Sequence, residues 1–127
     1  MKPLIIKGTE YSPEITFTPD TAVFVISGES RPEDAGKLYN TVLKWLEEYL
    51  AEAGKGNTGL RFEFKLLYFN TVSAKYILEI LRLLHISHSQ GHKIQVVWHY
   101  KAKDEDIKES GEEFARLVNL PFEFIKE

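Results

Sequence analysis

The sequence predicts a mixed α/β fold that forms a single domain over residues 1–127, and three observations lead to this prediction. Short strand-like segments fill the N-terminal part of the chain, and helix and strand periodicities then alternate to its end. The length suits one domain, and 43% of the residues are apolar, which is enough for a buried core. Because strands joined by helical crossovers run parallel, we expect a mixed, mostly parallel sheet with packed helices.

The N-terminal third reads as three short strands and a helix. The strands are PLIIKG, EITFTP and TAVFVISG, and they predict an antiparallel meander over about residues 3–28. Ser30 and Glu33 have the spacing of a capping box, with Pro32 tolerated in the first turn, so Ser30 is expected to cap the first helix. Apolar residues then recur at helical spacing until Gly54, which can close the helix in a left-handed conformation.

The rest of the chain alternates strand and helix patterns. After the loop GKGNTG, residues 60–69 alternate apolar and charged side chains, as a strand does. Residues 93–100 are apolar enough for a central strand, and an acidic helix runs from about Asp104 to Val118 before a last strand, FEFIKE. The helix between the strands at 60–69 and 93–100 is marked by Ile77, Ile80, Leu81 and Leu84.

The composition excludes several classes of protein. The chain has no cysteine, so it has no disulfide framework, thiol nucleophile or thiolate metal site. A net charge of −3 with scattered basic residues argues against nucleic-acid binding. No segment approaches the roughly 20 apolar residues that a membrane span requires. We therefore expect a cytoplasmic protein that binds neither nucleic acid nor membrane.

A small polar segment, Asn70-Thr71-Val72-Ser73, interrupts two apolar runs where the strand ending at Phe69 passes into the second helix. Functional groups gather at the carboxyl ends of parallel strands, because helix N-termini meet there with unpaired N–H groups. Two interpretations stay open at this point. Asn70, Thr71 or Ser73 can cap the helix, which contributes about 1 kcal/mol. Alternatively, Thr71 is well placed at the helix N-terminus for a function that involves an anion.

The run LLYFNTVSAKYILEIL, with the segments at 11–35 and 96–125, resembles the SiaC family of bacterial regulatory phosphoproteins over nearly the whole chain. The order and spacing of several short motifs carry this resemblance. They are Pro13-Glu14-Ile15, Ile26-Ser27-Gly28 followed by Ser30 and Pro32-Glu33, Tyr68-Phe69-Asn70-Thr71, Trp98 with Tyr100, and Leu120-Pro121-Phe122-Glu123.

The resemblance implies a STAS-like fold, similar to that of the anti-sigma-factor antagonists, and a non-enzymatic role in partner switching without a cofactor. The family's phosphorylated threonine corresponds to Thr71, which a cognate Ser/Thr kinase would phosphorylate and a PP2C-type phosphatase would dephosphorylate. The unphosphorylated form is implied to bind and activate a diguanylate cyclase, and so to regulate cyclic di-GMP and biofilm formation.

Asn70, Ser73 and Lys75 form the expected environment of the phosphosite, and Ser73 is an alternative phosphosite. The chain departs from the family at Val72 and Ala74, where serines are frequent. The alternative function is a small-molecule domain that binds an anionic ligand at the same helix N-terminus without covalent modification. An enzyme of unrecognised type is a further alternative.

Two other groups of polar residues have simpler interpretations. His85, His88 and His92 fall at helical spacing, but Gly91 is expected to end the helix before His92, so we interpret them as surface or helix-end histidines rather than zinc ligands. The acidic residues at 104–113 read as the solvated face of an amphipathic helix, with a patch for a basic partner as a second possibility.

Overall fold

The computed structural model describes residues 1–53 and 59–127. Its elements follow one another as β1 (Leu4–Ile6), β2 (Glu14–Thr18), β3 (Val23–Ser30), α1 (Ala35–Ala53), β4 (Leu60–Phe69), α2 (Thr71–Ser89), β5 (Ile94–Tyr100), α3 (Glu105–Val118) and β6 (Phe122–Lys126). Of these helices, none has the length and apolar character needed to cross a bilayer.

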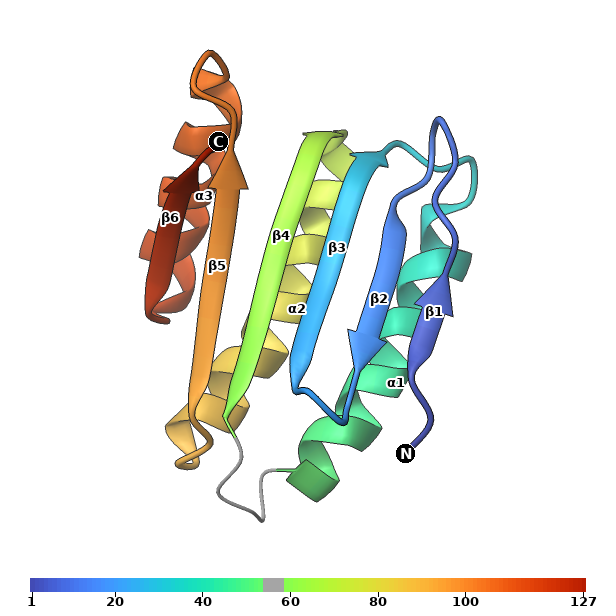
Figure 1. Cartoon of the computed structure of the whole chain (residues 1–127), viewed down its shortest axis with the longest axis vertical. Helices are drawn as coiled ribbons and strands as arrows, with labels where there is room; N and C mark the ends of the chain where they lie inside the picture. Colours follow the sequence, from blue (N-terminus) through green and yellow to red (C-terminus); the bar gives the residue numbers. More distant parts are fainter. Residues whose placement is uncertain (54–58) are drawn as a thin grey trace.

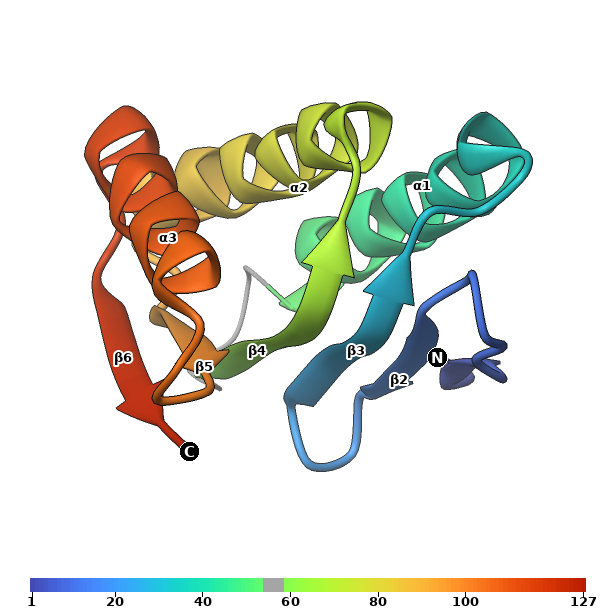
Figure 2. The ribbon, with the colours of Figure 1, turned by 90° about the horizontal axis from the view of Figure 1, so that it is seen from above.

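The six strands form one sheet in the order β1-β2-β3-β4-β5-β6 (Figure 1). β2 runs antiparallel to both of its neighbours, β1 and β3, and β3, β4, β5 and β6 are parallel. This arrangement confirms the predicted mixed α/β fold with its N-terminal meander. Figure 2 shows α1, α2 and α3 on the same side of the sheet. That follows from three crossovers that advance in the same direction, because right-handed connections of this kind place their helices on one face.

The predicted start of the first helix is wrong. Ser30 is the last residue of β3, where it pairs with Phe69 of β4, and its side chain is fully buried. The capping bond comes instead from Asp34, whose Oδ1 accepts the backbone N–H of Lys37 at 3.0 Å, so α1 begins at Ala35. The physical reason is that Ser30 continues the buried alternation of β3, which competes successfully with the local capping pattern. The expected closure at Gly54 lies outside the described residues.

The core fills the space between the sheet and its helices. Trp98 of β5 is the largest fully buried side chain, and its indole Nε1 donates a hydrogen bond to the carbonyl oxygen of Ile107 at 2.8 Å. Gly111, one turn further along α3, lies directly over the indole ring, and a Cβ there would sit 2.5 Å from two ring atoms. This close approach fixes α3 on the sheet. As predicted, α3 ends at Val118, and its C-cap Asn119 has a left-handed conformation with φ 51°.

A network of charged side chains lies on the sheet face opposite the helices. His99 Nε2 lies 2.6 Å from Glu63 Oε1, and His99 Nδ1 lies 2.8 Å from Glu127 Oε1 without hydrogen-bond geometry. Arg61 Nε donates to Glu63 Oε2 at 3.2 Å. Burial alone would raise the pKa of Glu63, but the hydrogen bonds and positive charges of His99 and Arg61 outweigh it and lower that pKa.

Candidate functional site

Thr71 is the first residue of α2, at the carboxyl end of the parallel strands. The preceding residue, Asn70, is the N-cap: its Oδ1 accepts the backbone N–H of Ser73 at 2.9 Å, and its own N–H donates to the carbonyl of Ser30 at 3.0 Å. The cap interpretation is therefore correct for Asn70. The Thr71 side chain is exposed and makes no hydrogen bond to any residue in the described part of the chain. Its hydroxyl group is available to a partner or a modifying enzyme.

Ser73 has the opposite environment from Thr71, because its side chain is fully buried. Its Oγ donates to the carbonyl oxygen of Ser30 at 3.0 Å and accepts from Ser30 Oγ at 2.8 Å. Since Ser30 gives its only hydroxyl proton to Ser73, the Tyr39 hydroxyl, 2.6 Å from Ser30 Oγ, must donate to Ser30. Burial raises the pKa of Tyr39, although its hydrogen bonds with the two serines act to lower it.

This hydroxyl network joins three elements. Ser30 ends β3, Tyr39 lies on the buried side of α1, and Ser73 lies in the first turn of α2. The ring of Tyr39 also stacks on that of Tyr76 at 5.2 Å between centroids. The network thus holds the start of α2 against β3 and α1, and it fixes the position of the exposed Thr71. The role of Ser30 was missed by sequence reasoning, because its partners lie far away in the chain.

The electrostatic surroundings of Thr71 suit a negative charge. The first turn of α2 contains no acidic residue, and the helix N-terminus carries unpaired N–H groups and the positive end of the helix dipole. Lys75 lies one turn after Thr71 and is exposed, with its Nζ 5.8 Å from the centroid of the Tyr76 ring. The ammonium group is therefore free to turn toward a phosphoryl group at Thr71.

Three exposed apolar side chains lie within four residues of Thr71. Leu67, Tyr68 and Val72 have exposed fractions of 52%, 48% and 52%. The first two stand at an irregularity in the β3–β4 register, where Gly28 pairs with Leu66 and the next pairing skips Leu67. Such bulges re-aim side chains near functional sites. We call Thr71 and these three residues, which lie close together in the sequence at the end of β4 and the start of α2, the Thr71 surface.

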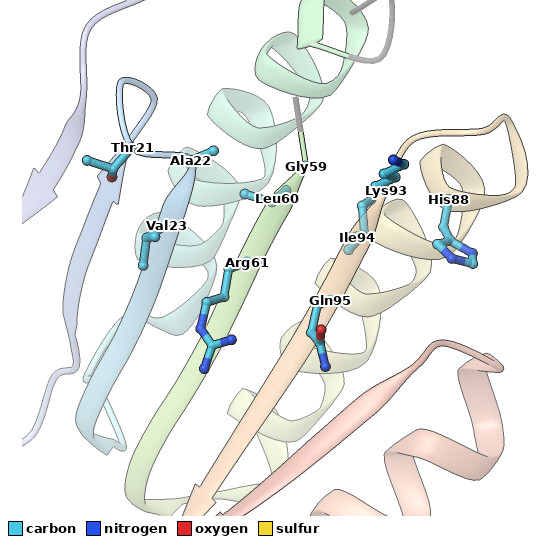
Figure 3. A pocket seen from close by; sticks show the side chains of 10 residues that line it. All are labelled: Thr21, Ala22, Val23, Gly59, Leu60, Arg61, His88, Lys93, Ile94 and Gln95. Atoms are coloured by element: carbon cyan, nitrogen blue, oxygen red, sulfur yellow. The ribbon is translucent and has the colours of Figure 1, made fainter. Parts of the chain in front are cut away.

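The hollow that borders the end of β4 is small and acidic. It has a volume of about 240 Å³, and Asp104 and Asp106 line it together with Leu67 and Tyr68. Two carboxylates disfavour an anionic ligand in this place. The larger hollow in Figure 3, about 460 Å³, lies at the amino ends of β4 and β5, beside Arg61 and Lys93, and so at the other end of the sheet from Thr71.

The histidines do not assemble into a common site. α2 ends at Ser89, and Gly91 follows with φ 101°, which agrees with the predicted end of the helix. His92 is consequently outside the helix, where its buried Nδ1 lies 3.0 Å from Ser87 Oγ. Among the residues that the structure describes, no three His, Asp or Glu side chains are placed to share a metal ion.

Comparisons with known proteins give a consistent result. Residues 6–127 match the family described as SiaC family regulatory phosphoprotein. An uncharacterized protein of Pseudomonas aeruginosa strain UCBPP-PA14 is 34% identical over 122 residues, which cover 96% of this chain and 94% of that protein.

Two solved structures from Pseudomonas aeruginosa are also similar. Apo-SiaC is 33% identical, with a TM-score of 0.88, over 98% of this chain and 99% of that one. SiaC in the crystal structure of diguanylate cyclase SiaD with its activator SiaC is 33% identical, with a TM-score of 0.91, over 98% and 99% of the two chains.

Proposed function

Because this chain belongs to the SiaC family of regulatory phosphoproteins, we propose that it is a non-enzymatic partner-switching protein whose state is set by phosphorylation of Thr71. The observation that carries the proposal is the contrast between two neighbouring hydroxyl groups. Thr71 is exposed and its hydroxyl makes no hydrogen bond to the residues that the structure describes, whereas Ser73 is buried and donates and accepts hydrogen bonds. A kinase could reach Ser73 only after the start of α2 had opened.

A phosphoryl group on Thr71 leaves the fold intact. It adds a charge of about −1.5 to −2 at pH 7, next to the positive end of the α2 dipole and without an acidic neighbour in the first turn. Lys75 is close enough along the helix to pair with it. Phosphorylation does not change the charge of the buried network of Ser30, Tyr39 and Ser73 behind Thr71. The switch therefore acts on the surface rather than on the core.

The partner responds because of the apolar character of the Thr71 surface. A protein that covers Leu67, Tyr68 and Val72 removes them from water and places its own groups against the Thr71 hydroxyl. After phosphorylation, the same contact would require a dianion to be desolvated, which costs several kcal/mol unless it is paired. One local charge thereby changes the affinity of the whole surface.

The partners follow from the family relationship. SiaC of Pseudomonas aeruginosa is the activator of diguanylate cyclase SiaD. In the proposed function, this chain in its unphosphorylated state binds and activates a diguanylate cyclase of its own host, and so regulates cyclic di-GMP and biofilm formation. A cognate Ser/Thr kinase adds the phosphoryl group and a PP2C-type phosphatase removes it.

The first experiment is to locate the phosphoryl group. We expect protein from the native host to carry it on Thr71, and phosphatase treatment to remove it. Trypsin places Thr71 and Ser73 together in the peptide Leu66–Lys75, so fragmentation has to separate the two positions. A phosphoryl group on Ser73 would contradict the assignment, because that residue is buried in the fold.

The second experiment measures binding to the host's cyclase by calorimetry. Thr71→Ala is expected to bind and activate like the unphosphorylated protein, and Thr71→Glu is expected to bind about tenfold or more weakly. Thr41→Glu is the matched control, since it adds the same charge at an exposed helical threonine of α1. Equal affinities for Thr71→Glu and Thr41→Glu would refute the charge mechanism.

A further inference from the structure

A groove of about 400 Å³ lies between the C-terminal halves of α2 and α3, at the opposite end of α2 from Thr71. We call it the α2–α3 groove. It is shaped by side chains from both helices and by the residue that caps α3. Its lining residues are Arg82, His85, Ile86, Leu117, Val118 and Asn119.

Two large aliphatic side chains of the α2–α3 groove are exposed. Ile86 of α2 has an exposed fraction of 53%, and Leu117 of α3 has one of 62%. Each lies on the solvent side of an otherwise amphipathic helix, and both border the same hollow. Isolated exposed apolar residues need no explanation, but here a pair from two elements borders one groove, and the gathering of exposed apolar groups is typical of an interaction site.

Two cationic side chains lie beside these aliphatic residues. Arg82 lines the groove and Arg116 precedes Leu117, and in residues 1–53 and 59–127 neither forms an ion pair. The other two arginines differ, because Arg31 pairs with Glu29 and Arg61 with Glu63. The free guanidinium groups favour a ligand with carboxylates, and arginine is enriched at protein interfaces for this reason.

The groove is too far from Thr71 to sense its charge. Ile86 follows Thr71 by fifteen residues on one helix, which corresponds to about 22 Å along the axis at about 1.5 Å per residue. That distance exceeds two Debye lengths at physiological ionic strength, each about 8 Å. A phosphoryl group at Thr71 therefore leaves the electrostatics of the α2–α3 groove essentially unchanged.

We propose that the α2–α3 groove is a second docking surface, that its ligand is an amphipathic helix of a protein partner with aliphatic side chains flanked by carboxylates, and that this binding does not depend on the state of Thr71. The proposal goes beyond the switch and does not require it. A surface that is the same in both states also suits a switch protein. The enzyme that adds a phosphoryl group and the enzyme that removes it must both recognise the chain, and they meet it in opposite states.

The test uses three synthetic helical peptides with an alanine-rich backbone. The first carries two leucines four residues apart with flanking glutamates, the second has lysines in place of the glutamates, and the third has alanines in place of the leucines. Methyl NMR on the full-length protein follows Ile86 and Leu117. We expect saturable shifts of both methyl groups with the glutamate peptide, and at least fivefold weaker binding of the other two.

Substitutions locate the site and separate it from the switch. Ile86→Ala should weaken binding of the glutamate peptide at least fivefold, whereas Ile5→Ala should not, since Ile5 has a similar exposed fraction, 58%, but lies on β1 outside the groove. Thr71→Glu should bind the peptide within twofold of the unmodified protein. Shifts confined to methyl groups outside the groove, equal binding of the lysine peptide, or a loss of affinity in Thr71→Glu would each overturn the proposal, whatever becomes of phosphorylation at Thr71.

Discussion

Replacing Gly111 by alanine should destabilise the protein, although alanine is the better helix former. The added Cβ would lie 2.5 Å from Cδ1 and from Nε1 of Trp98, and 2.7 Å from Cε2. Ordinary carbon contacts are about 3.5 to 4.0 Å, so either the indole ring or helix α3 has to move away by about 1 Å. The ring cannot turn freely, because it is 1% exposed and donates to the carbonyl of Ile107.

The size of the effect follows from two opposing contributions. Overpacking costs about 1–3 kcal/mol, and three ring atoms within 2.7 Å on a buried side chain place this site at the upper end. Alanine returns about 1 kcal/mol of helix propensity. The free energy of unfolding should therefore fall by about 2 kcal/mol, and Tm by about 6–10 °C for a domain of this size.

The assay is urea and thermal unfolding, followed by far-UV circular dichroism and tryptophan fluorescence. Ser110→Ala is the control, because it improves helix propensity at the neighbouring position of α3 without approaching Trp98. We expect this control to match or slightly exceed the parent protein in stability. A Gly111→Ala variant as stable as Ser110→Ala would refute the reasoning about the indole contact.

Two further substitutions test the polar networks. Tyr39→Phe keeps the ring but removes the hydroxyl that donates to Ser30, and should lower the free energy of unfolding by about 1 kcal/mol in urea titrations; no change would mean that the buried bond contributes nothing net. Because the pKa of Glu63 is lowered in the folded state, its carboxylate stabilises the fold above the ordinary carboxyl pKa of about 4.3, and this contribution is lost as the pH falls through the lowered value. Glu63→Gln should thus be less stable than the parent at pH 7, by up to about 1 kcal/mol, with the deficit shrinking near pH 3. A deficit that stays constant between the two pH values would exclude this linkage.

The parts of the fold that the sequence predicted are those with local causes. The alternation at residues 60–69 marks β4, Gly91 marks the end of α2, and α3 lies where its acidic cap and amphipathic pattern place it. The position of Thr71 followed for the same reason, since it depends on where a strand ends and a helix begins. Its exposure did not follow, because a shift of the helix start by one residue turns a side chain by about 100°.

The features that the sequence did not predict have distant causes. Ser30 matches a capping box, but it bonds to Ser73, 43 residues away, and no local pattern reports such a partner. The register irregularity beside Leu67 exists only in the pairing of two strands. Likewise, the carboxylates on either side of His99 come from different parts of the chain.

The sheet order, which repeats the chain order without a single exchange, has a consequence for assembly. Each new strand pairs with the strand made just before it, so a chain that emerges from the ribosome N-terminus first can extend its sheet at one growing edge. No strand has to wait for a later one to be inserted beside it, and no completed pairing has to reopen. The same order makes α3 and β6 the last elements added, so the indole of Trp98 is covered by α3 only at the end of assembly.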